Sequence, residues 1–213
     1  MRNRLLSHRG CWKHGYAKNS KAAFQRSFAN GYGVETDIRD QNGSLVISHD
    51  VPTVPCLSFQ EFLEMAVPDT LSEARVLALN IKSDGLTNLL QRCVSEYPSL
   101  NCFVFDMSVP DMRSYLDSNV SVFTRLSDVE PVPVWLDVSE GVWLDAFNGE
   151  WYSIDVVRDL LSSGKRVCIV SPELHLRPHE VFWARLRSVW SDPKLMLCTD
   201  YPDEAFSYFS GAG

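Results

Sequence analysis

Residues 20–39 read SKAAFQRSFANGYGVETDIR, and this stretch joins a helical segment to a buried strand. Apolar residues recur at helical spacing in its first half. Ser20 can cap the start of that helix, and Gly31 stands where a glycine just past the last turn would end it. The second half, GVETDIR at 33–39, has the short β-rich pattern of a strand. The stretch therefore predicts a helix that leads directly into a strand.

The same alternation of strand and helix continues along the chain. Helical spacing recurs in segments such as LTNLLQRCVSEYP and SIDVVRDLLSSG, where Ser153 and Gly164 repeat the cap and stop signals. Short apolar runs between the helical segments predict eight strands, at 4–8, 33–39, 75–82, 101–108, 120–126, 141–147, 166–172 and 194–200. Such alternation predicts a parallel sheet of the α/β class. Eight strands favour a single closed (β/α)₈ TIM barrel over residues 1–213, and a doubly wound open sheet is the alternative.

One segment interrupts this alternation after the second strand. Asn42-Gly43 is a strong signal for a tight hairpin turn, and SLVISHD at 44–50 follows it as an additional strand. We therefore expect a short β-hairpin excursion from the barrel. It would bring His49 close to the end of the strand that carries Asp37, where barrel enzymes place their functional groups.

Composition narrows the range of functions. The chain has 213 residues, of which 45% are hydrophobic and 22% are charged, and its formal net charge is −7. An acidic chain is a poor candidate for binding a nucleic-acid backbone, which requires clustered Lys and Arg. Six cysteines occur without a CxxC pair, so the usual spacing of a zinc site is absent. Neither a secretory signal nor an apolar run long enough to span a membrane is visible, which predicts a cytoplasmic protein. The oligomeric state stays open.

Oxygen-bearing side chains collect at the predicted strand ends. Glu35 and Asp37 alternate along one strand, so both should project from the same face. Asn80 stands near the end of the next parallel strand. Because the carboxyl ends of parallel strands converge on the barrel mouth, these groups should meet there. Carboxylate and amide oxygens suit Mg²⁺ or Ca²⁺ better than zinc.

Basic and aromatic side chains are expected at the same mouth. His8 and Arg9 follow the first strand, and Lys82 follows the third. Arg9 and Lys82 have the chemistry to bind a phosphate, while two histidines, His8 and His49, could serve as general acid and general base. Trp12 lies in the loop after His8 and is a candidate for substrate contact.

Four segments together resemble the glycerophosphodiester phosphodiesterase family. They are SHRG, then NSKAAFQRSFANGYGVETDIRDQNGSLVISHD, then LALNIK, and near the end TDYPDEAF. The resemblance implies a (β/α)₈ barrel, a divalent-metal site, a small phosphodiester substrate and a place in lipid metabolism. It also implies roles for individual residues. The acid–base pair would be His8 and His49, and the phosphate-binding groups would be Arg9 and Lys82. The metal ligands would be Glu35, Asp37 and Asn80.

The sequence departs from the family pattern at three places. Asn80 stands where the family has a third glutamate, and Lys18 stands where it has another. After His49 the chain runs almost directly into a helical segment, so the family's small insertion is mostly missing. Two alternatives to hydrolysis therefore remain: a catalytically idle barrel that binds a phosphorylated ligand, and a lyase-type enzyme that forms a cyclic phosphate.

Overall fold

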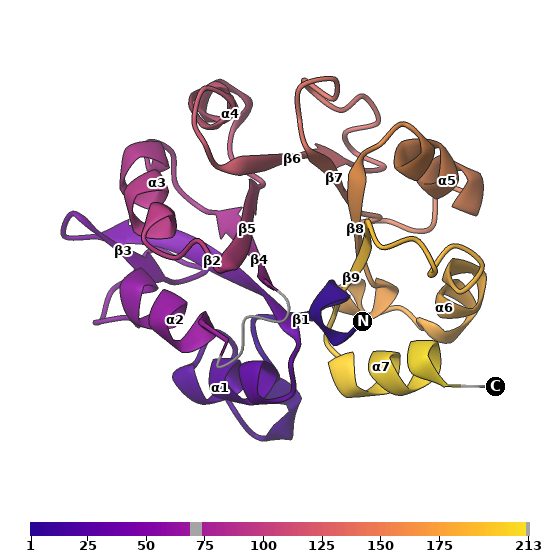
Figure 1. Cartoon of the computed structure of the whole chain (residues 1–213), viewed down its shortest axis with the longest axis horizontal. Helices are drawn as coiled ribbons and strands as arrows, with labels where there is room; N and C mark the ends of the chain where they lie inside the picture. Colours follow the sequence, from indigo (N-terminus) through magenta and orange to yellow (C-terminus); the bar gives the residue numbers. More distant parts are fainter. Residues whose placement is uncertain (69–73, 212–213) are drawn as a thin grey trace.

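The protein is a closed parallel barrel with one additional strand outside it (Figure 1). The structure, a computed structural model, describes residues 1–68 and 74–211. The barrel closes because β1 pairs in parallel with both β9 and β2. The strands are β1 (Leu5–His8), β2 (Gly33–Gln41), β3 (Ser44–Ile47), β4 (Arg75–Ile81), β5 (Leu100–Phe105), β6 (Ser121–Leu126), β7 (Gly141–Leu144), β8 (Arg166–Val170) and β9 (Leu195–Thr199). The predicted (β/α)₈ barrel is confirmed, and the open sheet is not formed.

The extra strand is the predicted hairpin. β3 pairs antiparallel with the far end of β2, and Gln41 lies opposite Ser44 across the turn. Asn42 and Gly43 both have positive φ, 53° and 80°, as a type I′ turn requires. The chain then reaches α2 through residues 48–58, which form no helix and no strand beyond one isolated bridge. The hairpin thus brings His49 back from the turn to the level of Asp37, near where β2 stops pairing with β4.

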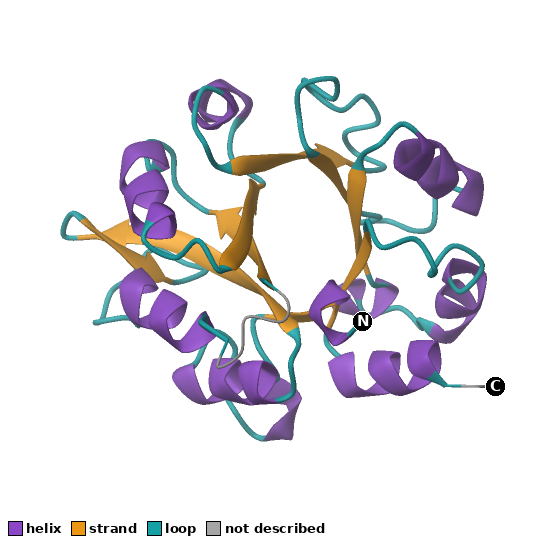
Figure 2. Ribbon diagram, in the orientation of Figure 1, coloured by secondary structure: helices purple, strands orange, loops and turns teal. Residues whose placement is uncertain are grey.

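Helices surround the barrel in an outer ring (Figure 2). In the described part of the chain they are α1 (Lys21–Ala29), α2 (Phe59–Ala66), α3 (Thr87–Ser95), α4 (Val109–Leu116), α5 (Ile154–Ser162), α6 (Glu180–Leu186) and α7 (Pro202–Ser210), with 3₁₀ turns η1 (Arg2–Arg4), η2 (Trp12–His14) and η3 (Pro172–His175). The Ser20 and Ser153 hydroxyls accept hydrogen bonds from the first turns of α1 and α5, as predicted. Gly31 and Gly164 have positive φ just past the ends of those helices. None of the described helices is long and apolar enough to cross a membrane.

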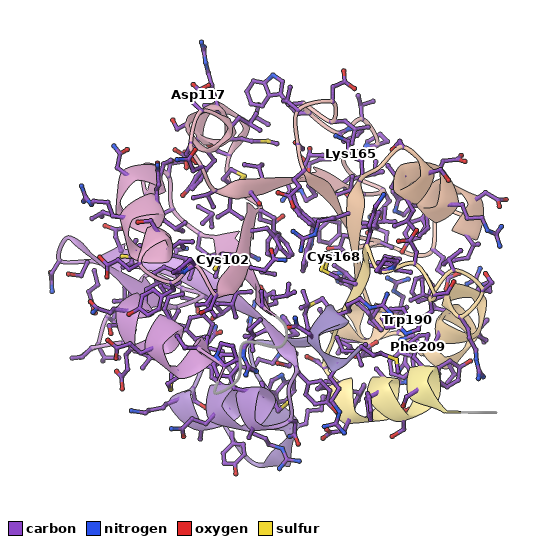
Figure 3. All side chains as sticks on the ribbon, in the orientation of Figure 1. Cys102, Asp117, Lys165, Cys168, Trp190 and Phe209 are labelled. Carbon is purple, nitrogen blue, oxygen red and sulfur yellow. The ribbon has the colours of Figure 1, made fainter. Side chains whose placement is uncertain are left out.

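The core has an inner and an outer layer. Inside the barrel, Phe103 stacks on Phe123 and Phe105 stacks on Trp143, with ring centroids 3.8 Å and 3.7 Å apart. Cys168 belongs to this inner layer, on the inner side of β8 (Figure 3). Outside the barrel the helices bury a second layer against the strands, where Trp190 stacks on Phe209, for example. Apolar side chains therefore fill the interior, and the functional groups are left at its open end.

Gly141 allows the inner layer to pack this closely. A Cβ added there would lie 2.5 Å from the Phe123 ring and 2.7 Å from the backbone oxygen of Arg166. Backbone in a barrel strand cannot easily yield, so we expect Gly141→Ala to lower the free energy of unfolding by about 1–3 kcal/mol. Urea denaturation of both proteins would measure the change. An unchanged unfolding midpoint would contradict the close approach.

Candidate active site

A pocket of about 360 Å³ opens at the carboxyl ends of the strands. Five of the residues that the sequence predicted for the site line it: His8, Arg9, Glu35, His49 and Asn80. The other three lie just behind the pocket: Asp37 pairs with Arg9, Lys82 pairs with Asp37, and Trp12 donates a hydrogen bond to Asp200. The fold therefore brings the predicted side chains to one place from β1, β2, the hairpin and β4.

His8 is fixed by the carboxylate of Asp200, the residue that follows the last strand. Its Nδ1 lies 2.7 Å from Oδ1 of Asp200, and the indole N–H of Trp12 donates to the same oxygen at 3.3 Å. Burial lowers the pKa of His8, and the Asp200 carboxylate offsets part of that change. Burial alone would raise the pKa of Asp200, but the hydrogen bond from His8 brings it below its ordinary value. A carboxylate at Nδ1 holds the proton there and leaves Nε2 free to act as a base.

Glu35 lies next to His8 and has no hydrogen-bonding partner for one oxygen. Its residue is 2% exposed, and its Oε2 is 4.0 Å from Nε2 of His8. That oxygen is buried and accepts no hydrogen bond from any described residue. Burial and, next, repulsion from Asp37 raise the pKa of Glu35 to about 8. A buried carboxylate in this condition has a strong affinity for a cation.

Asp37, by contrast, is already neutralised. It is fully buried, with Nε of Arg9 2.9 Å from one carboxylate oxygen and Nζ of Lys82 3.4 Å from the other. The Asn19 amide donates to Asp37 at 2.8 Å, and Thr36 in turn donates to Asn19 at 2.9 Å. The two cations predicted to bind phosphate thus form ion pairs with this carboxylate in the structure.

Asn80 presents an oxygen without a partner. Its Nδ2 donates to Oδ2 of Asp106 at 3.2 Å, while its Oδ1 is buried and accepts no hydrogen bond from the described chain. The guanidinium of Arg125 lies 2.9 Å from the other oxygen of Asp106. Burial raises the pKa of Asp106, and Arg125 opposes that change. The hydrogen bond to Asp106 orients the amide so that its carbonyl oxygen is the free group.

The oxygen atoms at this end of the pocket provide some, but not all, of the ligands that a divalent cation requires. Glu35 Oε2 and Asn80 Oδ1 are both buried oxygens that lack a partner, and such atoms suit Mg²⁺ or Ca²⁺. Asp37 is engaged by Arg9 and Lys82. Within residues 1–68 and 74–211, no group of three or more His, Cys, Asp or Glu side chains is arranged to hold a metal. Asp37 Oδ1 is also buried without a hydrogen bond, but it lies 3.4 Å from Nζ of Lys82, so a cation here would rest mainly on Glu35 and Asn80.

His49 and Lys18 complete this side of the pocket. The His49 side chain is 46% exposed, and its Nδ1 lies 2.9 Å from Oδ1 of Asp50. Lys18 lines the same pocket, with its ammonium 4.5 Å from the centre of the Trp12 ring. From the sequence, Lys18 was only a departure from a family pattern. In the structure it supplies a pocket cation that has no ion-pair partner among the described residues.

The opposite wall of the pocket contains a pair that the sequence did not reveal. Nε2 of His175 lies 2.7 Å from Oδ1 of Asp145, and both residues line the pocket. In the sequence, the spacing of His175 and His179 after the seventh predicted strand is only a weak hint of a second metal or substrate contact, and Asp145 was not a candidate. The position of Asp145 could have indicated a place at the barrel mouth, because it directly follows β7, as the other polar groups of the site follow their own strands.

Two solved structures resemble this fold over nearly its whole length. A glycerophosphodiester phosphodiesterase from Agrobacterium tumefaciens superposes with a TM-score of 0.70 and 14% identity, covering 97% of this chain and 99% of that one. The chain has the fold of a glycerophosphodiester phosphodiesterase. A glycerophosphoryl diester phosphodiesterase from Parabacteroides distasonis superposes with a TM-score of 0.64 and 14% identity, covering 97% of this chain and 85% of that one. No family model and no curated protein matches the sequence.

Proposed function

We propose that the protein is a phosphodiesterase that cleaves a P–O bond of a small, glycerophosphodiester-like substrate. The observation that carries this proposal is the single pocket shared by His8, His49 and Arg9 at the barrel mouth. The likeness of the fold to two phosphodiesterases supports it. So does the sequence resemblance, because the motifs that carry it contribute to the same pocket.

In this proposal His8 and His49 exchange protons with the substrate. One histidine removes the proton from the attacking hydroxyl, and the other donates a proton to the leaving alkoxide, which is too basic to leave unaided near neutral pH. Asp200 holds His8 in the tautomer that leaves Nε2 available. His49 is half exposed, which lets it reach a substrate that enters from solvent.

Charge on the phosphoryl oxygens requires positive partners. A divalent cation, Mg²⁺ or Ca²⁺, would be held by Glu35 and Asn80 and would neutralise part of that charge when bound. Lys18 lines the pocket without an ion-pair partner in the described chain, and can therefore attract the phosphate. Arg9 and Lys82 neutralise the charge of Asp37. They can bind the phosphate directly only if their ion pairs with this buried carboxylate are broken.

A second candidate, a barrel that binds a phosphorylated ligand without turnover, is favoured by one observation. Asp37 is already paired with two cations, and the third ligand position is the neutral Asn80. Such a pocket can still bind an anion, but its affinity for a divalent metal is lower than that of a pocket with a carboxylate in place of Asn80. The two candidates differ in one measurable property, which is turnover.

The experiment is a screen of phosphodiesters with wild type and His49→Ala in the presence of Mg²⁺, Ca²⁺ or Mn²⁺. We expect wild type to turn over at least one small diester and His49→Ala to be about 10²–10⁴-fold slower. Phosphorus NMR of the product distinguishes a phosphomonoester from a cyclic phosphate. Binding of a diester without turnover in any metal would overturn the proposal and leave the idle barrel.

A cytoplasmic location also stays a prediction, which cell fractionation would test.

A further inference from the structure

The far wall of the pocket has a polar pair that the proposed chemistry does not use. Asp145 directly follows β7, and His175 is the last residue of η3. Both line the pocket that also contains His8 and Glu35. The phosphate chemistry described above is placed on β1, β2, β4 and the hairpin, so this pair faces a different part of any substrate that occupies the pocket.

The carboxylate of Asp145 is rigidly held. Its Oδ1 accepts a hydrogen bond from the backbone N–H of Ala146 at 2.7 Å. The indole N–H of Trp151 donates to the backbone oxygen of Asp145 at 2.8 Å. The Asp145 side chain is only 8% exposed. A carboxylate fixed in this way also fixes whatever group it binds, which here is the imidazole of His175.

The orientation of His175 leaves one nitrogen available. Its Nε2 is 2.7 Å from Oδ1 of Asp145, so the neutral ring carries its proton on Nε2. Within the part of the chain that the structure describes, Nδ1 makes no hydrogen bond, and the side chain is 22% exposed. The ring of Phe147 packs edge-on against the imidazole, with centroids 5.2 Å apart. Nδ1 is therefore a preoriented hydrogen-bond acceptor that solvent and ligands can reach.

We propose that His175, oriented by Asp145, is a specificity-determining residue that accepts a hydrogen bond from a hydroxyl on one alcohol substituent of the phosphodiester. This inference rests on the proposed function. Apolar side chains of Trp143, Val170 and Leu174 line the same wall and provide contacts for the carbon chain of that substituent. A site that pairs with a hydroxyl discriminates strongly against a substituent that lacks one, because the polar group is then left without a partner.

The test compares two diesters that differ only in their hydroxyl groups, one with a 2,3-dihydroxypropyl substituent and one with a propyl substituent. Wild type should prefer the dihydroxypropyl diester. His175→Phe, which keeps an aromatic ring beside Phe147, should lower kcat/KM for that diester by about 10- to 100-fold, mainly through KM. It should leave kcat/KM for the propyl diester within about twofold. Asp145→Asn should reduce the same preference to a smaller extent.

Equal losses on both diesters in His175→Phe would overturn the inference, because they would indicate a catalytic or purely structural role. An unchanged preference would overturn it as well. Calorimetric binding of 2,3-dihydroxypropyl phosphate and propyl phosphate separates this inference from the proposed function. If wild type turns over neither diester but binds the hydroxylated phosphate more tightly, and His175→Phe loses that difference, the subsite stands and the proposed activity fails. Equal binding of both phosphates by wild type would reject the subsite.

Discussion

Replacing His8 by alanine should lower kcat by about 10²–10⁴-fold on any diester that wild type cleaves. The reason is geometric: Asp200 fixes one ring nitrogen, so the other is the only nitrogen that can exchange a proton in the pocket. Steady-state kinetics would measure the loss, and a thermal melt would show that the variant is folded. A kcat within a few-fold of wild type would exclude His8 from the chemistry.

His179 provides a matched control for this experiment. Its ring lies against Trp183, with centroids 4.0 Å apart, and its Nε2 is 3.1 Å from Glu204. The residue is 7% exposed and does not line the pocket. His179→Gln should therefore lower the melting temperature, as expected for a buried side chain with broken contacts, and change kcat only slightly. The two histidine variants together distinguish loss of a catalytic group from loss of stability.

Chelation by EDTA should abolish activity, and Mg²⁺ or Ca²⁺ should restore it. At a metal concentration of 100 times Kd, binding should also raise the free energy of unfolding by about 2.7 kcal/mol. Glu35→Gln should lose both effects, because it removes the carboxylate that carries the buried, unpartnered oxygen. Differential scanning calorimetry with and without metal would measure the stabilisation independently of activity.

Asp40→Asn is the control for the metal experiment. Asp40 lies on the same strand as Glu35 but is exposed, and one of its oxygens accepts a hydrogen bond from Ser83. Its replacement should leave the metal-induced stabilisation unchanged. A wild-type stabilisation that persists in Glu35→Gln would place the cation elsewhere, and no stabilisation in wild type would favour the idle barrel.

The sequence was sufficient to predict the barrel because its signals are local. The caps at Ser20 and Ser153, the turn at Asn42-Gly43 and the short apolar runs each specify one element within a few residues. Regular alternation then leaves few topologies, and parallel strands bring their carboxyl ends together without further information. The meeting of His8, Glu35 and Asn80 in one pocket follows from that geometry.

The partners of each charged group could not be predicted in the same way. Arg9 and Lys82 have the chemistry to bind a phosphate, but they come from different strands, and both lie against Asp37. Asp106, which follows the neighbouring strand β5, orients Asn80. Distances between side chains of different strands depend on register and rotamers, which no short pattern in the sequence encodes. For the same reason His175 was only a weak candidate, and its pairing with Asp145 could not be predicted.

The hydrogen bond between His8 and Asp200 joins the first strand of the barrel to the residue that follows the last one. During synthesis, β1 leaves the ribosome long before Asp200 has been added to the chain. Until then His8 has no carboxylate at Nδ1 and no closed ring of strands around it. On the proposed function, His8 therefore acquires the carboxylate that orients it only after translation has passed β9, and a polypeptide that ends earlier lacks an oriented His8.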